Sequence, residues 1–318
     1  AVDSVPYNTF VHNELILFSV ADNARSIPCV VDGLKPSQRK VLFSCFKRNL
    51  KNEIKVAQLA GYVSEHSAYH HGEMSLNGTI IGMAQSFTGS NNINLLFPSG
   101  QFGTRLMGGK DAASPRYVFT RLEKITRAIF HPHDDPILSY LQDDGQSIEP
   151  EWYMPVIPMV LVNGGDGIGT GWSTSIPNYR PQDIIQNLRH MIEGNEPEPM
   201  HPWFRGFKGA IDAKTGVKDL GNYAVLGVVE QLNDAGTSFL ISELPVKKWT
   251  ADYKQFLEGM LPGADAKNAA GLIKDFKENH TDTEVSFTVT LTTEQAAALG
   301  GGGASQKALQ KFFKLESS

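Results

Sequence analysis

The chain has 318 residues, of which 41% are hydrophobic and 20% are charged, as expected of a soluble globular protein with room for about two domains. The longest apolar run, residues 156–162, is too short to span a bilayer, and the N-terminus lacks the features of a secretory signal. The two cysteines, Cys29 and Cys45, provide neither a disulfide framework nor a zinc ligand set, which indicates an intracellular, reducing location.

Positive charge is concentrated in one part of the sequence. Residues 25–127 contain 14 Lys and Arg against 6 Asp and Glu, although the whole chain contains 29 against 34. This asymmetry predicts a surface that binds a polyanion on an otherwise acidic protein. A solvated basic face without a partner is the alternative.

The first elements in chain order are helices. Asn8 or Thr9 can cap a helix that runs to about Ala24, and Lys35-Pro36 opens the next one. The polar face of this second helix carries four cationic residues: Arg39, Lys40, Lys47 and Arg48. A short helix over residues 54–59 is expected to stop near Gly61, and a longer one is expected over residues 73–87. A long loop and a strand over residues 117–122 complete the order of a helix-turn-helix with a wing.

The most informative stretch, GTRLMGGKDAASPRYVFT at residues 103–120, is glycine-rich and cationic and ends in the pair Arg116-Tyr117. Such a loop cannot form part of the core, because its backbone polar groups would lack partners. A phenol there is an available nucleophile, and the neighbouring guanidinium can hold a phosphate. A tyrosine packed at the start of a strand is the alternative.

The second half of the chain alternates strands and helices. After a Pro- and Gly-rich connector, a helix is expected over residues 181–191, with Gly194 as its stop. Strands are expected over residues 223–232, 238–244 and 285–291, and helices near residues 251–260, 269–280 and 305–313. Residues 300–303, all glycine, are expected to form a flexible break. The pattern is that of an α+β domain.

Two further patterns compete with this interpretation. His66 and His70 at i, i+4 could bind zinc from one helical face, as in a metal hydrolase, but no glutamate lies between them and no third ligand is evident. The glycines of residues 164–171 fail the spacing of a dinucleotide-binding loop and are better explained as a sharp turn that joins two domains. Ile168 at the tip of that turn has little to pack against, so it could be an apolar wedge for a partner or for a base step.

Five segments together resemble the breakage-reunion region of eukaryotic type IIA DNA topoisomerases. They are RSIPCVVDGLKPSQRKVLF (25–43), GYVSEHSAYHHGEMSL (61–76), NLLFPSGQFGTR (94–105), GGKDAASPRYVFT (108–120) and EPEWYMPVIPMVLVNGGDGIGTGWST (149–174). The resemblance is dense to about Lys208 and looser from there to Ser318. The segment EPEWYMPVIP favours the eukaryotic branch over the bacterial gyrase branch.

This resemblance implies a catabolite-activator-like winged-helix domain over residues 1–154, followed by an α/β tower domain over residues 155–318. It implies that Tyr117 attacks a DNA phosphodiester and becomes linked to the 5′ phosphate, in a double-strand break that is resealed after a second duplex has passed through it. Arg116 matches the adjacent phosphate-stabilising arginine. Arg25, Lys35 and His71 match further groups of the same pocket.

The resemblance also identifies Ile168 with the residue that wedges between base pairs of the cleaved duplex. Further DNA contacts are expected from four residues: Lys40, His70, Arg105 and Lys110. A phenol with an ordinary pKa near ~10 needs such cationic neighbours in order to react at neutral pH. The phosphotyrosyl bond keeps its energy, so resealing requires no ATP.

The resemblance implies finally that the chain is a middle piece of a longer, ATP-dependent enzyme. The Mg²⁺ site of the family lies in a TOPRIM domain and its ATP site in an ATPase domain, both before this segment, so no metal ligands are expected here. The implied partners are double-stranded DNA and, in the full nuclear enzyme, a second copy of the chain. Without the exit gate the piece alone can be monomeric, and it is expected to bind DNA weakly without cleaving it efficiently. A non-catalytic winged-helix DNA-binding module is the alternative.

Overall fold

A computed structural model of the chain describes residues 4–214, 221–263 and 271–318, which form two compact units. The first unit contains the chain up to residue 86 together with residues 90–102 and 113–202. The second contains residues 87–89, 103–112 and 203–318. The last change from the first unit to the second falls at residue 202, and residues 103–112 of the glycine-rich loop belong to the second unit. The winged-helix and tower domains with a boundary at residue 154 stay a prediction.

The first unit begins with a continuous helical segment formed by α1 (Tyr7–Phe10), η1 (Val11–Leu15) and α2 (Ile16–Ser26). The expected cap at Asn8 or Thr9 is wrong, because Pro6 precedes the first helical residue and no side chain caps the helix. The helix ends where Ile27 becomes extended, as expected of a residue that precedes a proline.

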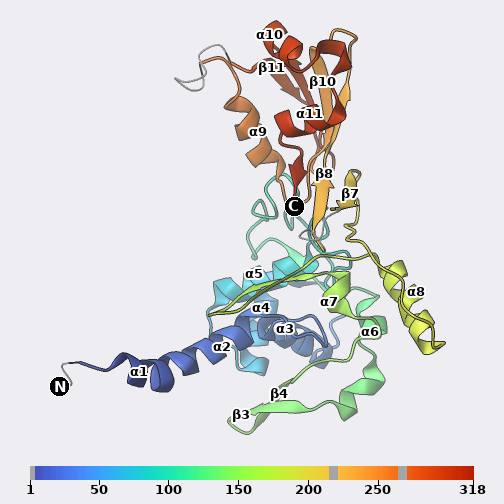
Figure 1. Cartoon of the computed structure of the whole chain (residues 1–318). Helices are drawn as coiled ribbons and strands as arrows, with labels where there is room; N and C mark the ends of the chain where they lie inside the picture. Colours follow the sequence, from blue (N-terminus) through green and yellow to red (C-terminus); the bar gives the residue numbers. More distant parts are fainter. Residues whose placement is uncertain (1–3, 215–220, 264–270) are drawn as a thin grey trace. The chain divides into compact units, whose positions relative to one another are not determined.

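Three helices of 12 residues each form the centre of this unit: α3 (Pro36–Lys47), α4 (Val56–Ser67) and α5 (Glu73–Ala84), all visible in Figure 1. The expected start of α3 at Pro36 is confirmed. The expected stop near Gly61 is wrong, since α4 continues for six residues beyond it. Burial outweighs the low helix propensity of glycine here, because α4 contributes Val56, Leu59, Ala60 and Val63 to the core.

The wing is shorter than expected. β1 (Ile54–Lys55) pairs antiparallel with β2 (Phe119–Thr120), and isolated bridges join Leu96 to Leu122 and Ser99 to Phe119. Residues 54 and 55 were expected to be helical, but they form a strand. The long loop between α5 and β2 is confirmed.

The rest of the first unit consists of short elements and one longer helix, α8 (Pro181–Ile192). As expected, α8 starts at a proline and stops at Gly194, which has a φ of +83°. The glycine-rich turn is part of a hairpin of β5 (Gly165–Ile168) and β6 (Ser173–Ile176). The other elements are α6 (Thr126–Ile129), η2 (Pro132–Ile137), β3 (Tyr140–Asp143), β4 (Gln146–Pro150) and α7 (Met159–Val162).

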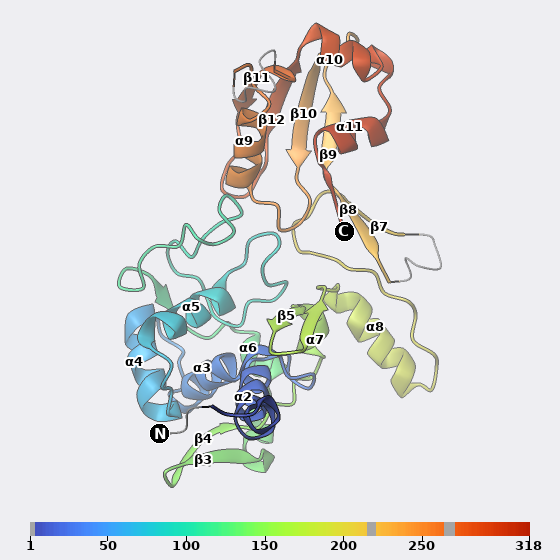
Figure 2. The same cartoon turned by 60° about the vertical axis from the view of Figure 1, so that its left-hand side comes forward.

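The second unit is built on an antiparallel sheet with the strand order β11-β12-β10-β9, beside which α9 and α11 lie in Figure 2. A smaller sheet has the order β13-β8-β7. The elements are β7 (Ala210–Ala213), β8 (Tyr223–Leu226), β9 (Val228–Gln231), β10 (Ser238–Glu243), α9 (Thr250–Glu258), β11 (Ile273–Glu278), β12 (Phe287–Leu291), α10 (Thr293–Ala298), η3 (Gly301–Gly303), α11 (Gln306–Phe312) and β13 (Glu316–Ser317).

Two expectations for the second unit are wrong. Of the helix expected over residues 269–280, residues 269 and 270 lie outside the described part of the chain, and Ile273–Glu278 form strand β11 instead. Pairing with β12 decides this conformation, which a helical pattern in the sequence cannot reveal. The expected flexible break at residues 300–303 is a short helical turn, η3, preceded by a helix, α10, that was not expected.

The buried apolar side chains form one cluster in each unit. Within the described residues, the helices are too short or too polar to cross a membrane.

Candidate functional site

Tyr117 lies on a tight turn at the surface of the first unit. Its backbone N–H donates to the carbonyl of Ser114 at 2.9 Å, and its side chain is 76% exposed. Arg116 beside it is exposed as well. The alternative of a packed tyrosine is therefore excluded, and the phenol is open to a ligand from outside.

The turn is held at both ends by the start of α4. The carbonyl of Pro115 accepts a hydrogen bond from the N–H of Ala57 at 3.1 Å, and the carbonyl of Val118 accepts one from Val56 at 3.0 Å. These N–H groups belong to the first turn of a helix, where no intrahelical partner exists. The chain on either side of Tyr117 thus serves as the cap of α4, and the buried side chain of Val118 fastens it further.

A cleft of about 760 Å³ elsewhere in the first unit brings together three of the expected site residues, Arg25, Lys35 and His71. They come from the end of α2, the residue before α3 and the loop before α5. Lys40 lines the same cleft, and Tyr117 and Arg116 are not among its lining residues. Two cations and an imidazole on one concave surface are suited to a phosphate.

The position of Lys35 depends on a buried ion pair. Asp32 is fully buried and receives hydrogen bonds from Nε and Nη2 of Arg39, at 2.7 and 3.0 Å, and from the N–H groups of Leu34 and Tyr153, both at 3.0 Å. Arg39 was expected on the polar face of α3, but it is 5% exposed and faces Asp32. The pair fixes the turn from which Lys35 leads into α3.

Two other expected DNA contacts have partners within the protein. The ammonium of Lys40 donates to the carbonyl of Ser67 and to Glu149, at 2.9 Å, and its side chain is 14% exposed. His70 is exposed, and its Nε2 lies 3.9 Å from a carboxylate oxygen of Asp143. His70 is thus accessible to a ligand, whereas the charge of Lys40 is balanced by a buried carboxylate.

The zinc interpretation of His66 and His70 does not fit the geometry. α4 ends at Ser67 and Ala68 is left-handed, so the two histidines do not share a helical face. His66 stacks on Tyr62, and its Nδ1 lies 3.0 Å from the carbonyl of that residue. Among the described residues, no three His, Cys, Asp or Glu side chains are grouped in a way that could hold a metal ion.

Ile168 stands at the end of β5, beside the turn of the β5–β6 hairpin, and is 84% exposed. The hairpin is attached to α2 by two side chains that sequence reasoning missed. Asp22 accepts a hydrogen bond from the Thr170 hydroxyl at 2.8 Å, and the Asn23 amide donates to the Thr170 carbonyl at 3.2 Å. The hydrogen bond from Thr170 holds the pKa of Asp22 below its usual value. The wedge candidate is thereby tied to the helix that carries Arg25.

Arg105 and Lys110, the last expected DNA contacts, belong to the second unit. Lys110 is exposed. The side chain of Arg105 is only 7% exposed, and both of its terminal nitrogens bond to the buried carboxylate of Glu243. Arg105 is therefore engaged inside the protein and is not presented to a phosphate, contrary to the expectation.

Comparisons with known proteins agree with the resemblance. The family model that describes the A-type subunit of DNA gyrase and topoisomerase IV matches residues 25–318. The chain belongs to this topoisomerase family. It is 56% identical to human DNA topoisomerase 2-alpha over 313 residues, which are 98% of this chain. It is 57% identical to Drosophila melanogaster DNA topoisomerase 2 over 288 residues, which are 90% of this chain.

A solved structure shows the same fold. The Plasmodium falciparum topoisomerase II DNA-binding, cleavage and re-ligation domain superposes with a TM-score of 0.88 at 51% identity, over 99% of this chain and 41% of that one. The match confirms the α+β class and places the chain with the cleavage region of type II topoisomerases. The chain spans only about one fifth of the length of the curated topoisomerase 2 relatives.

Proposed function

We propose that the chain is the DNA-cleavage segment of an ATP-dependent type II DNA topoisomerase, in which Tyr117 is the nucleophile. The oxygen of the phenol attacks a backbone phosphorus, a phosphotyrosyl bond forms to the 5′ phosphate, and the 3′ oxygen leaves with a proton. The reverse attack by that 3′ hydroxyl reseals the strand. The observation that carries the proposal is the exposure of Tyr117 next to Arg116 on a turn that α4 holds in place.

The cationic cleft supports the binding of a DNA backbone to the same unit. Arg25, Lys35 and His71 line it, and each can donate a hydrogen bond to a phosphate oxygen. Ile168 is the proposed wedge, because a large apolar side chain that stands free on a braced hairpin can enter a base step. Lys110 and His70 are further proposed contacts.

The full protein is proposed to act as a nuclear homodimer on double-stranded DNA. Mg²⁺ and ATP are proposed to bind to parts of the protein outside this chain, as the resemblance implies. The competing proposal is a DNA-binding module without chemistry, for which the exposed basic residues alone would suffice.

Replacement of Tyr117 by Phe in the full-length protein separates the two. If the protein is the enzyme, the covalent adduct trapped by detergent is expected to disappear, while non-covalent DNA affinity stays within about twofold, because only one hydroxyl is removed. Tyr7→Phe is the matched control, since this tyrosine is 90% exposed and lies in α1. An adduct that persists in Tyr117→Phe, or is never formed by the parent protein, would contradict the assignment.

A second test concerns the wedge. Ile168→Ala is expected to reduce the bend of the bound duplex, measured by energy transfer between labelled DNA ends, without affecting the thermal stability, because the side chain has few contacts to lose. Ile192→Ala is the control, since that residue is similarly exposed, at 85%, at the end of α8. An unchanged bend angle in the Ile168 variant would refute its role.

A further inference from the structure

Residues 103–112 form a closed loop within the second unit. The Thr104 hydroxyl and N–H both donate to the carboxylate of Asp111, at 2.5 and 2.9 Å, and the N–H of Gly109 donates to the Thr104 carbonyl at 2.9 Å. These bonds join the two ends of the loop to each other. The loop is therefore a defined structural element, closed by its own hydrogen bonds.

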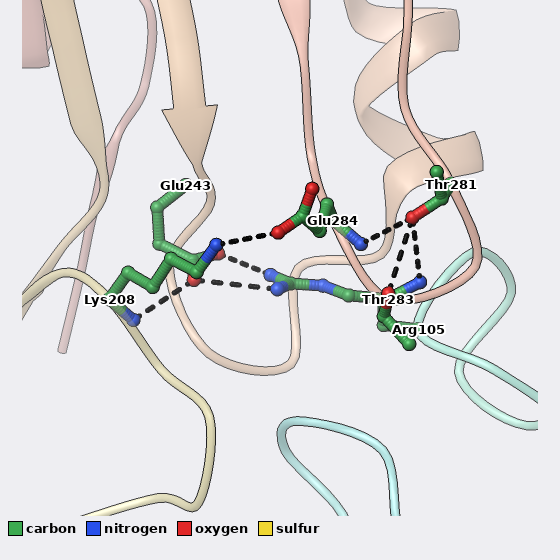
Figure 3. A network of polar contacts seen from close by, with 6 residues as sticks. All are labelled: Arg105, Lys208, Glu243, Thr281, Thr283 and Glu284. Atoms are coloured by element: carbon green, nitrogen blue, oxygen red, sulfur yellow. Dashed lines mark hydrogen bonds and ion pairs between the residues drawn. The ribbon is translucent and has the colours of Figure 1, made fainter.

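Arg105 anchors this loop to the sheet of the second unit. Its guanidinium donates through two nitrogens to the carboxylate of Glu243, the last residue of β10. Figure 3 shows Glu243 between Arg105 and Lys208, whose backbone N–H also donates to it at 3.1 Å. The N–H of Leu244 supplies a further hydrogen bond at 2.8 Å. Glu243 is fully buried, and the guanidinium of Arg105 balances the charge of its carboxylate.

The backbone of the loop caps α9 as well. The carbonyls of Arg105 and Leu106 accept hydrogen bonds from the N–H groups of Thr250 and Ala251, at 3.3 and 2.9 Å, in the first turn of that helix. The ring of Trp249 lies where a side chain at Gly108 would stand, so the loop packs closely against the start of α9. The loop is thus attached to the second unit by an ion pair, by two backbone hydrogen bonds to the first turn of α9 and by a close contact with the ring of Trp249.

The same loop is covalently continuous with the turn that carries the nucleophile. The chain returns to the first unit at Ala113, whose N–H donates to the Gln101 carbonyl at 2.9 Å, three residues before Arg116. Two cationic residues of the loop were expected to contact DNA, yet Arg105 is buried and makes an internal ion pair. The role of Arg105 therefore needs an explanation other than phosphate binding.

We propose that Arg105 and Glu243 are positioning residues that hold the segment leading to Arg116 and Tyr117, and so make DNA cleavage dependent on the second unit. The inference rests on the proposed function of Tyr117. A planar guanidinium that reaches both carboxylate oxygens restricts the orientation as well as the distance of the loop. Small misplacements of a reacting group reduce rates by large factors, so loosening of this anchor is expected to slow adduct formation.

The test compares variants of the full-length protein. Arg105→Lys keeps the charge but removes the two-nitrogen contact, and is expected to lower the rate of adduct formation about 10- to 100-fold while DNA affinity changes less than about threefold. Lys208→Met is the matched control, because its ammonium pairs with Glu284 at the surface, and both side chains of that pair are more than half exposed. Its adduct rate is expected to equal that of the parent.

A second control separates positioning from a general loss of stability. Val289 is buried in the sheet of the second unit and lies far along the chain from the loop of residues 103–112. Val289→Ala is expected to open a cavity there and to lower the melting temperature of the second unit. Hydrogen exchange in a peptide covering residues 113–119 is expected to quicken in Arg105→Lys and to stay unchanged in Val289→Ala. If Arg105→Lys does not fold, the double variant Arg105→Met/Glu243→Met, which removes both charges, replaces it with the same expected results.

The outcomes distinguish a failure of the proposed function from a failure of the positioning role. If the parent protein forms no adduct at Tyr117, the proposed function itself fails. If the parent forms the adduct, and Arg105→Lys forms it at the parental rate with unchanged exchange in residues 113–119, only the positioning role is overturned. A rate that falls equally in Arg105→Lys and Val289→Ala also overturns it, because stability alone would then explain the loss.

Discussion

Removal of the buried carboxylate at position 32 is expected to destabilise the first unit strongly. Asn in place of Asp32 would remove the counter-charge of Arg39 and turn an amide N–H₂ toward the guanidinium, which has no acceptor to offer. Because Asp32 is fully buried and Arg39 is 5% exposed, water cannot compensate. Breaking one side of a buried pair costs about 3–5 kcal/mol.

For a unit of this size, each kcal/mol shifts the melting temperature by roughly 2–4 °C, so a decrease of about 6–20 °C is expected. The assay is thermal and urea unfolding of the chain, followed by circular dichroism. Asp135→Asn is the control, because its ion pair with Arg127, at 2.6 Å, has side chains that are 35% and 28% exposed. Such a pair contributes about 0–1 kcal/mol.

The stabilising role of the buried Asp32–Arg39 pair would be disproved if Asp32→Asn lowered the free energy of unfolding by no more than Asp135→Asn does. The double variant Asp32→Leu/Arg39→Met is expected to recover much of the loss, because no unpaired charge stays buried. It would also show whether the turn before α3 needs the ion pair or only a filled space.

Three further outcomes follow from the structure. Burial raises the pKa of the Cys45 thiol to about 12. Alkylation at pH 8 is therefore expected to label Cys29, which is partly exposed, and to spare Cys45 until the protein unfolds. Equal labelling of the two cysteines, measured by mass spectrometry, would be contrary evidence. Gly167→Ala is expected to lower the free energy of unfolding by about 1–3 kcal/mol, because its Cβ would stand 2.5 Å from a carbonyl oxygen of α2. Gly78→Ala has open space inside α5, so it is expected to raise the free energy of unfolding by about 0.5–1 kcal/mol in denaturant titrations. The hydrogen bond from Thr170 lowers the pKa of Asp22 from its ordinary value of 3.8. The ionised carboxylate therefore stabilises the attachment of the β5–β6 hairpin above pH 3.8, and this stabilisation is lost as the pH falls through the lower pKa of the folded state. Hydrogen exchange in the hairpin should therefore quicken only below about pH 4, and quickening near pH 6 would point to another group.

Much of the candidate site could be predicted from local sequence. The glycine-rich run before Arg116 and Tyr117 predicted a loop outside the core, and the exposure of Tyr117 agrees with it. The role of nucleophile is implied by the resemblance and stays a prediction. The clustering of cationic residues in residues 25–127 indicated a basic surface, but not which members of it are free. Lys35 and Lys40 both line the cleft, but ion pairing distinguishes Lys35 from Lys40, Arg39 and Arg105, whose charges are balanced inside the protein.

The sequence by itself determined where several helices begin or end and which family motifs the chain contains. Prolines at the first positions of α3 and α8, and a glycine after α8, set the ends of those helices because their effects on φ and on the backbone N–H act within one turn. The motifs of residues 25–174 likewise identified the family. Only the tertiary structure decided that residues 273–278 form a strand, that α4 continues through Gly61, that the division between units falls at residue 202, and that a presumed DNA-binding arginine is an internal anchor. Each of these depends on a partner far away along the chain, such as β12 for β11 or Glu243 for Arg105, and the free energy of such a contact exists only once the two segments have been brought together.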